Sequence, residues 1–106
     1  MLKMQTKTMT DGNSIMHVVY YTGFNKYKLH DMMVELTKLK LNEMLEIGYT
    51  IEQLRDMESP DVEDILYDLQ NAVFQDSKKQ WYMPFKDMPE NYIRASYIDV
   101  MRKDFA

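Results

Sequence analysis

The stretch of sequence that decides the fold is GYTIEQLRDMESPDVEDILYDLQNAV, residues 48–73. Thr50 and Gln53 have the spacing of a capping box, in which each side chain bonds to the backbone N–H of the other residue. Ser59 followed by Pro60 is typical of a second helix start, because serine caps a helix and proline suits its first turn. The letters therefore predict a short helix over 50–57 and a longer helix over 60–75.

The longer helix has an apolar stripe that predicts a surface facing the core. The members of the stripe recur at helical spacing: Val62, Ile65, Leu66, Leu69 and Val73. Two flanks border it, an aromatic one with Tyr67 and Phe74 and an acidic one with Asp61, Asp64 and Asp68. We expect both flanks to be available to a partner, and a merely solvated acidic face is the alternative.

The remaining segments complete the prediction of a mainly α protein. About four helices are expected over 27–47, 50–57, 60–75 and 90–104, with one or two short strands over 15–21 and, as the second candidate, 80–85. Residues 1–12 lack periodicity and predict a flexible N-terminal tail ending at a turn-prone Asp11-Gly12-Asn13. Residues 13–106 are expected to form a single small globular domain, since a chain of this length can bury one core.

Two of these segments have surfaces that predict contacts. The helix over 27–47 has a second apolar stripe opposite its core face, formed by Val34, Leu41 and Leu45. This stripe either closes a homo-oligomer or is covered by other helices of the same chain. The strand over 15–21 needs a neighbour, which is either 80–85 or a strand of another molecule.

The aromatic segment from residue 81 to residue 85 is a further candidate contact surface. It contains Trp81, Tyr82 and Phe85, and Pro84 prevents a regular helix there. Aromatic residues dominate interface hot spots, and a loop stiffened by proline presents them with little loss of entropy. The alternative is that Trp81 closes the core beneath the loop.

The composition excludes several classes of function. The chain of 106 residues has 17 acidic and 13 basic side chains and a formal net charge of −4, which disfavours nonspecific binding to nucleic acid or to an anionic membrane. Cysteine is absent, so disulfides and thiolate metal sites are excluded. No apolar run is long enough to span a bilayer, and we expect a cytoplasmic protein without a membrane partner.

Signatures of enzymes are also missing. Three glycines in the whole chain cannot build a glycine-rich phosphate loop, and neither a nucleophile elbow nor an HExxH motif occurs. The two histidines, His17 and His30, do not stand in a metal-ligand pattern. The sequence therefore predicts no catalysis, no cofactor and no bound metal.

Two capped helices with a tight turn between them suggest the helix-turn-helix of DNA-binding proteins. Residues 60–75 contain no lysine or arginine, however, so phosphates would repel the second helix. We expect a small acidic protein that binds a partner protein with a basic surface, as an inhibitor or an assembly factor. The alternatives are a self-assembling homo-oligomer and a nucleic-acid-associated regulator of helix-turn-helix type.

The chain is rich in methionine, with 11 residues, and lacks both cysteine and catalytic motifs. In this composition it is similar to many small phage-encoded proteins, among them inhibitors of host machinery and virion-assembly chaperones. The similarity carries no functional residue with it.

Overall fold

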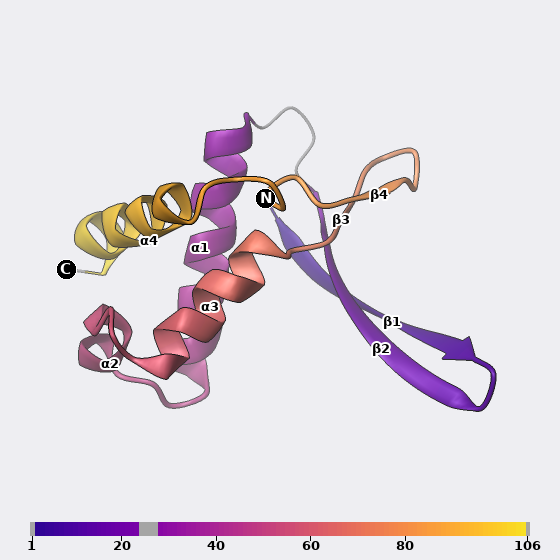
Figure 1. Ribbon diagram of the computed structural model, residues 1–106, viewed down its shortest axis with the longest axis horizontal. Helices are drawn as coiled ribbons and strands as arrows, with labels where there is room; N and C mark the ends of the chain where they lie inside the picture. The colour runs from indigo at the N-terminus through magenta and orange to yellow at the C-terminus, as the bar shows by residue number, and fades with distance from the viewer. Residues whose placement is uncertain (1, 24–27, 106) are drawn as a thin grey trace.

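The described part of the chain combines four helices with a four-stranded mixed sheet, so the prediction of a mainly α fold is wrong. The computed structural model describes residues 2–23 and 28–105. The strands follow the order β1-β2-β3-β4 across the sheet. Figure 1 shows the helices gathered on one side, while the β1–β2 hairpin extends away from them.

The N-terminal region forms a long hairpin where the sequence predicted a flexible tail over 1–12. Strand β1 (Lys3–Asp11) pairs with β2 (Ser14–Thr22) in antiparallel register from Lys3↔Thr22 to Asp11↔Ser14. The two-residue loop is Gly12-Asn13, and Gly12 has a φ of 61°. A positive φ at the first loop residue is the pattern of a type II′ turn, whose twist matches that of the strands. Strand β2 thus has an internal partner along its whole length.

Two short strands complete the sheet. Strand β3 (Phe74–Gln75) runs parallel to β2 through the pair Tyr21↔Phe74, and β4 (Trp81–Tyr82) runs antiparallel to β3. The helix predicted over 60–75 therefore ends earlier, because its last residues join the sheet. The predicted strand over 80–85 is present as the two residues of β4.

The helices largely follow the predicted segments. They are α1 (Leu29–Glu46), α2 (Ile51–Arg55), α3 (Pro60–Gln70) and α4 (Glu90–Asp104). The predicted first residue of the long helix, Tyr27, lies outside the described residues. Gly48, with a φ of 110°, follows α1 and donates its backbone N–H to Leu45 O.

The predicted caps of α2 and α3 are confirmed. The Thr50 backbone N–H donates to Gln53 Oε1 at 2.8 Å, and the Gln53 backbone N–H donates to Thr50 Oγ1 at 3.2 Å. The hydroxyl of Ser59 accepts from the Asp61 backbone N–H at 3.3 Å, and Pro60 occupies the first turn. These local bonds fix where both helices begin.

The core lies between the helices and the base of the sheet. Its fully buried side chains come from every helix, from β3 and from the segment before α4, and include Met33, Leu36, Leu41, Leu54, Val62, Leu69, Phe74, Phe85, Ile93, Tyr97 and Val100. From the hairpin, only Tyr21 belongs to this cluster, together with Leu2 just before β1. The hairpin is therefore anchored at its base, and most of its other residues are exposed.

Replacing Thr50 with alanine is expected to lower the free energy of unfolding by about 1 kcal/mol, because the Gln53 N–H loses its acceptor. Urea denaturation followed by circular dichroism measures the change. Ser77→Ala, at an exposed loop serine, is the control and is expected to have almost no effect. Equal stability of Thr50→Ala and the wild type would contradict a stabilising role of the capping box.

Candidate functional site

The hairpin carries most of the exposed apolar side chains of the described residues. Of nine large hydrophobic residues that are exposed, five lie on β1 and β2: Met4, Met9, Ile15, Met16 and Val19. Ile15 is 69% exposed and Met16 is 50% exposed. They lie on both faces of the hairpin, Met4, Ile15 and Val19 on one and Met9 and Met16 on the other. Monomeric proteins rarely expose large apolar patches, and such patches usually mark contact sites.

One face of the hairpin carries apolar and aromatic side chains together with the polar Gln5 and Lys7. Because residues paired directly across two strands point to the same side of a sheet, the pairs Met9↔Met16, Lys7↔Val18 and Gln5↔Tyr20 share this face. Trp81 of β4 packs edge-on against Tyr20, with 4.8 Å between ring centroids, and Lys7 Nζ lies 5.7 Å from the Trp81 ring. We call this surface the Trp81 face; its members are Lys7, Met9, Met16, Val18, Tyr20 and Trp81.

The outer edge of β2 has free backbone groups. The Tyr21 backbone N–H donates to Val73 O at 2.9 Å, so Tyr21 directs its backbone away from β1. In an antiparallel pair every second residue directs its backbone N–H and C=O to the same side, so Val19, His17 and Ile15 also direct theirs away from β1. Strand β3 pairs with β2 only at Tyr21, so within the described residues no strand covers these three. None of them is a lysine or a proline, the residues that often protect an edge strand.

The base of the hairpin is held by the half-buried Lys40, which lies between the buried Tyr21 and the exposed Asp68. Lys40 Nζ of α1 lies 5.9 Å from the centroid of the Tyr21 ring and 3.7 Å from Asp68 Oδ2 of α3. Burial raises the pKa of Tyr21. Burial lowers the pKa of Lys40, but Tyr21, Asp68 and Glu43 outweigh it, so the net pKa of Lys40 lies above its ordinary value. Lys40 therefore stays charged and ties the hairpin to both helices.

Within each of the two predicted flanks of α3, some residues are exposed and others are buried or half-buried. Tyr67 is 67% exposed, and Asp64 and Asp68 are exposed as well. Asp61 is half-buried and accepts a hydrogen bond from Tyr49 Oη at 3.2 Å. Phe74 is fully buried, so the prediction of Phe74 as a contact residue needs correction. Phe74 lies beyond the end of α3, in β3, and its ring packs in the core.

The residues of the predicted aromatic segment, 81–85, also differ in exposure. Trp81 is 43% exposed, and Tyr82 is half-buried with its ring 6.0 Å from that of Phe74. Phe85 is fully buried and meets the Phe74 ring edge-on, so it is a core residue and not a contact residue. Trp81 is thus the member of this segment that offers most surface to a partner.

The residues predicted to close an oligomer are covered by the chain itself. Leu41 is fully buried, which removes it from any such contact, and Val34 and Leu45 are half-buried against the core. The helix α1 lies among the other helices, in agreement with the alternative of a helix covered on both sides.

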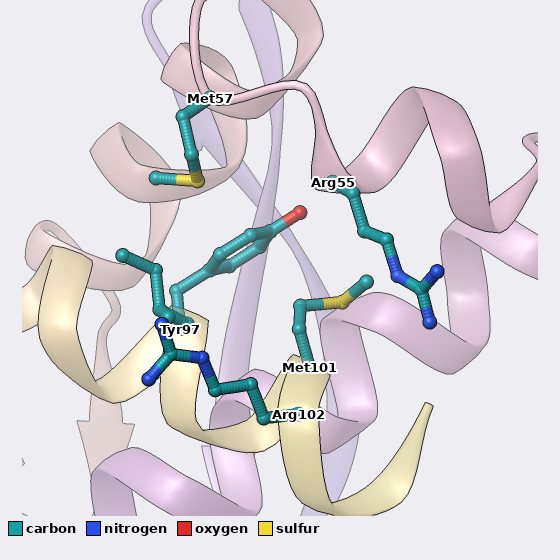
Figure 2. Close-up of a pocket in the computed structure, with 6 residues that line it drawn as sticks. Arg55, Met57, Tyr97, Met101 and Arg102 are labelled. Atoms are coloured by element: carbon teal, nitrogen blue, oxygen red, sulfur yellow. The ribbon is translucent and has the colours of Figure 1, made fainter. Parts of the chain in front are cut away.

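A pocket of about 430 Å³ lies between the end of α2 and one side of α4. Its apolar lining consists of Met57, Tyr97, Ile98 and Met101, and Arg55 and Arg102 complete it. Figure 2 shows the two arginines on either side of Met101, with the Tyr97 ring behind them. The Tyr97 hydroxyl donates to Leu54 O, and burial raises the pKa of Tyr97 to about 12.

Sequence reasoning missed the exposed apolar residues of β1 and the two arginines of this pocket. A signal for the hairpin was present, since two strand-like runs separated by Gly-Asn are typical of a two-residue hairpin loop. No comparable signal exists for Arg55 and Arg102, which are 47 residues apart in the chain and line one pocket only because of the tertiary fold.

Searches within the described residues add two findings. No helix there is both long and apolar enough to cross a membrane. No group of three or more His, Cys, Asp or Glu side chains there is arranged to hold a metal ion. Comparison of the chain with models of protein families, with curated proteins and with solved structures finds no match.

Proposed function

We propose that the chain is a non-catalytic protein that binds another protein through the Trp81 face of its hairpin. The observation that carries the proposal is the exposure of apolar residues there: Met9 is 44%, Met16 50% and Trp81 43% exposed on one face of a hairpin that stands away from the body. Contact with an apolar surface of a partner would remove these side chains from water.

The residue types of the Trp81 face support this proposal. Tryptophan and tyrosine dominate the binding energy of interfaces, and methionine adapts its shape to the surface it meets. An isolated two-stranded hairpin is marginally stable in water, so a partner that covers one face would also stabilise the hairpin. Figure 1 shows that the helices leave this part of the hairpin accessible.

The carboxylates on the surface of α3 support the expectation that the partner has a basic surface. Asp64 is exposed, Glu63 and Asp68 are exposed on the same helix but pair with Arg94 and Lys40, and the chain as a whole has a net charge of −4. Such a surface favours a partner with basic residues and accelerates the encounter with it. We propose that the protein acts by occupying the surface of that partner, as an inhibitor or an assembly factor. DNA reading by α2 and α3 is not part of the proposal, since the same carboxylates repel phosphate.

Met16→Lys and Ile47→Lys provide a matched test. Both replace an exposed apolar residue by the same charged one, but Ile47 is 71% exposed at the end of α1 and lies outside the hairpin. Affinity capture from cells of the native source identifies the partner, and titration of the purified partner then gives the dissociation constant. We expect Met16→Lys to weaken binding at least about tenfold and Ile47→Lys to leave it unchanged.

The single tryptophan offers a direct reading of the contact. Trp81 is the only tryptophan in the chain, so its fluorescence reports on the Trp81 face alone. A shift of its emission to shorter wavelength on addition of a partner without tryptophan is expected, because the partner removes water from the ring. Unchanged emission with full binding, or equal affinity of Met16→Lys and the wild type, would refute the proposed contact.

Self-association is the second candidate, and the open edge of β2 favours it. Ile15, His17 and Val19 direct backbone N–H and C=O groups outward, where an edge of a second copy would satisfy them. Size exclusion coupled to light scattering decides this point. A mass that rises above 12.8 kDa with concentration, and that falls back when Val19 is replaced by proline, supports self-association. A mass that stays at that of the monomer at every concentration rejects it.

A further inference from the structure

The charges of the chain are unevenly distributed between the sheet and the helices. Residues 3–22 and 74–82, which contain the four strands, include four lysines and two aspartates. The rest of the chain has nine basic and 15 acidic residues. Figure 1 shows the hairpin and β4 on one side of the molecule and α2, α3 and α4 on the other. The sheet region is therefore basic in a chain that is acidic overall.

The four lysines of the sheet region lie on or next to the Trp81 face. Lys3 and Lys7 belong to the set of alternate β1 residues that point to this face, and Lys7 Nζ is 5.7 Å from the centroid of the Trp81 ring. Lys78 and Lys79 are in the loop directly before β4. All four are exposed, and no ion pair among the described residues involves them.

The two aspartates of the sheet region offset this positive charge only in part. Asp11 ends β1 at the tip of the hairpin. Asp76 Oδ1 accepts the backbone N–H groups of Lys78 and Gln80 at 2.8 Å and 2.9 Å, so this carboxylate holds the loop before β4 in shape. An excess of positive charge thus borders exposed apolar and aromatic side chains, and it favours a partner of the opposite charge.

We infer that the part of the partner that binds the Trp81 face is a peptide segment with both carboxylates and apolar side chains. The inference rests on the proposed function, because it concerns the contact proposed there. Apolar side chains of the segment would cover Met16 and Trp81, and its carboxylates would lie beside Lys7. The basic surface expected opposite α3 is a different part of the partner.

A single strand of nucleic acid is the other anionic molecule with apolar surface to consider. Its bases stack on aromatic rings, and its phosphates would meet the same lysines. The acidic helices repel phosphates, however, and the methionines of the Trp81 face, Met9 and Met16, do not provide a stacking surface. These features favour the acidic peptide segment.

A synthetic peptide in which aspartate alternates with leucine is a suitable probe, and the same peptide with asparagine for aspartate is its neutral counterpart. Neither contains tryptophan, so the emission of Trp81 follows the titration of each into the full chain. The acidic peptide is expected to shift this emission to shorter wavelength. We expect it to bind at least about tenfold more tightly than the neutral peptide, with an affinity that falls as salt is added. Failure of the acidic peptide to bind, equal affinity of the two peptides, or tighter binding of oligothymidylate would overturn the inference.

Lys7→Gln and Lys103→Gln are matched variants for the same titration. Both remove the charge of an exposed lysine, but Lys103 lies near the end of α4, away from the hairpin (Figure 1). Lys7→Gln is expected to weaken binding of the acidic peptide about fivefold and Lys103→Gln to leave it unchanged. Equal affinities of Lys7→Gln and the wild type would contradict the inference.

Titration of the captured partner separates this inference from the proposed function. If Met16→Lys weakens binding of the partner and Lys7→Gln does not, the contact through the Trp81 face stands and the acidic segment is rejected. If neither variant changes the affinity, the contact itself is rejected. Weaker binding of the partner by both variants, with Lys103→Gln unchanged, supports both proposals.

Discussion

Replacing Phe74 with alanine is expected to lower the free energy of unfolding by about 3–5 kcal/mol. The Phe74 side chain is fully buried and contacts three aromatic rings, those of Tyr21, Tyr82 and Phe85, at centroid distances of 5.5, 6.0 and 5.7 Å. The residue is also the one through which β3 pairs with both β2 and β4. Alanine would therefore leave a cavity where the sheet joins the core, and urea denaturation followed by circular dichroism measures the loss.

Tyr67→Ala is the matched control for this prediction. Tyr67 and Phe74 are seven residues apart, and the sequence placed them on the same exposed flank. Tyr67 is 67% exposed, so its removal is expected to change the free energy of unfolding by less than about 0.5 kcal/mol. Comparable losses in the two variants would contradict the different burial of these residues.

Raising the pH from about 10 to about 12 is expected to destabilise the protein by roughly 2–3 kcal/mol through Tyr97 alone. Burial raises the pKa of Tyr97 from 10.0 to about 12 in the folded state. Between these values the unfolded chain loses the phenolic proton and the folded chain keeps it, so the unfolded state is favoured as the pH rises. The contribution of the Tyr97 phenol to the free energy of unfolding is full below about pH 10, and it is lost as the pH rises to about 12. Denaturation curves recorded across this pH range measure how steeply the free energy of unfolding falls with pH.

Tyr97→Phe isolates this contribution. The variant lacks the phenol, so its stability is expected to fall less steeply above about pH 10, although Tyr21, Tyr49 and Tyr82, whose pKa values are also raised, still contribute. Near neutral pH it is expected to be about 1 kcal/mol or more less stable, because Leu54 O loses its donor. Identical alkaline slopes for the variant and the wild type would refute the role of Tyr97.

The helices were predictable because their signals are local. Thr50 with Gln53 and Ser59 with Pro60 specify two helix starts through bonds within three residues, and the predicted stripe residues Val62, Ile65, Leu66 and Leu69 are buried. The end of α3 was less predictable. Nothing in the sequence around Phe74 outweighs its helical spacing, and a contact with Tyr21, more than fifty residues earlier, takes it into the sheet instead.

The hairpin was missed for a different reason. A strand with one buried face alternates between apolar and polar residues, whereas every residue of β1 is exposed and its sequence alternates weakly. Threonine-rich composition and the Gly12-Asn13 loop were the available signals, and both are compatible with a tail as long as no second strand is recognised. The expectation that the strand over 15–21 pairs with 80–85 or with another molecule followed directly from this omission.

The sequence by itself determined the four helices, their caps and the acidic character of the chain, because these depend on neighbouring residues and on composition. Only the tertiary structure decided which candidates are accessible. It placed Phe74, Phe85 and Leu41 in the core, left Met16 and Trp81 exposed, and made Arg55 and Arg102 line one pocket. The physical reason is that burial is a property of contacts between distant segments, and residue type and spacing along 48–73 do not specify those contacts.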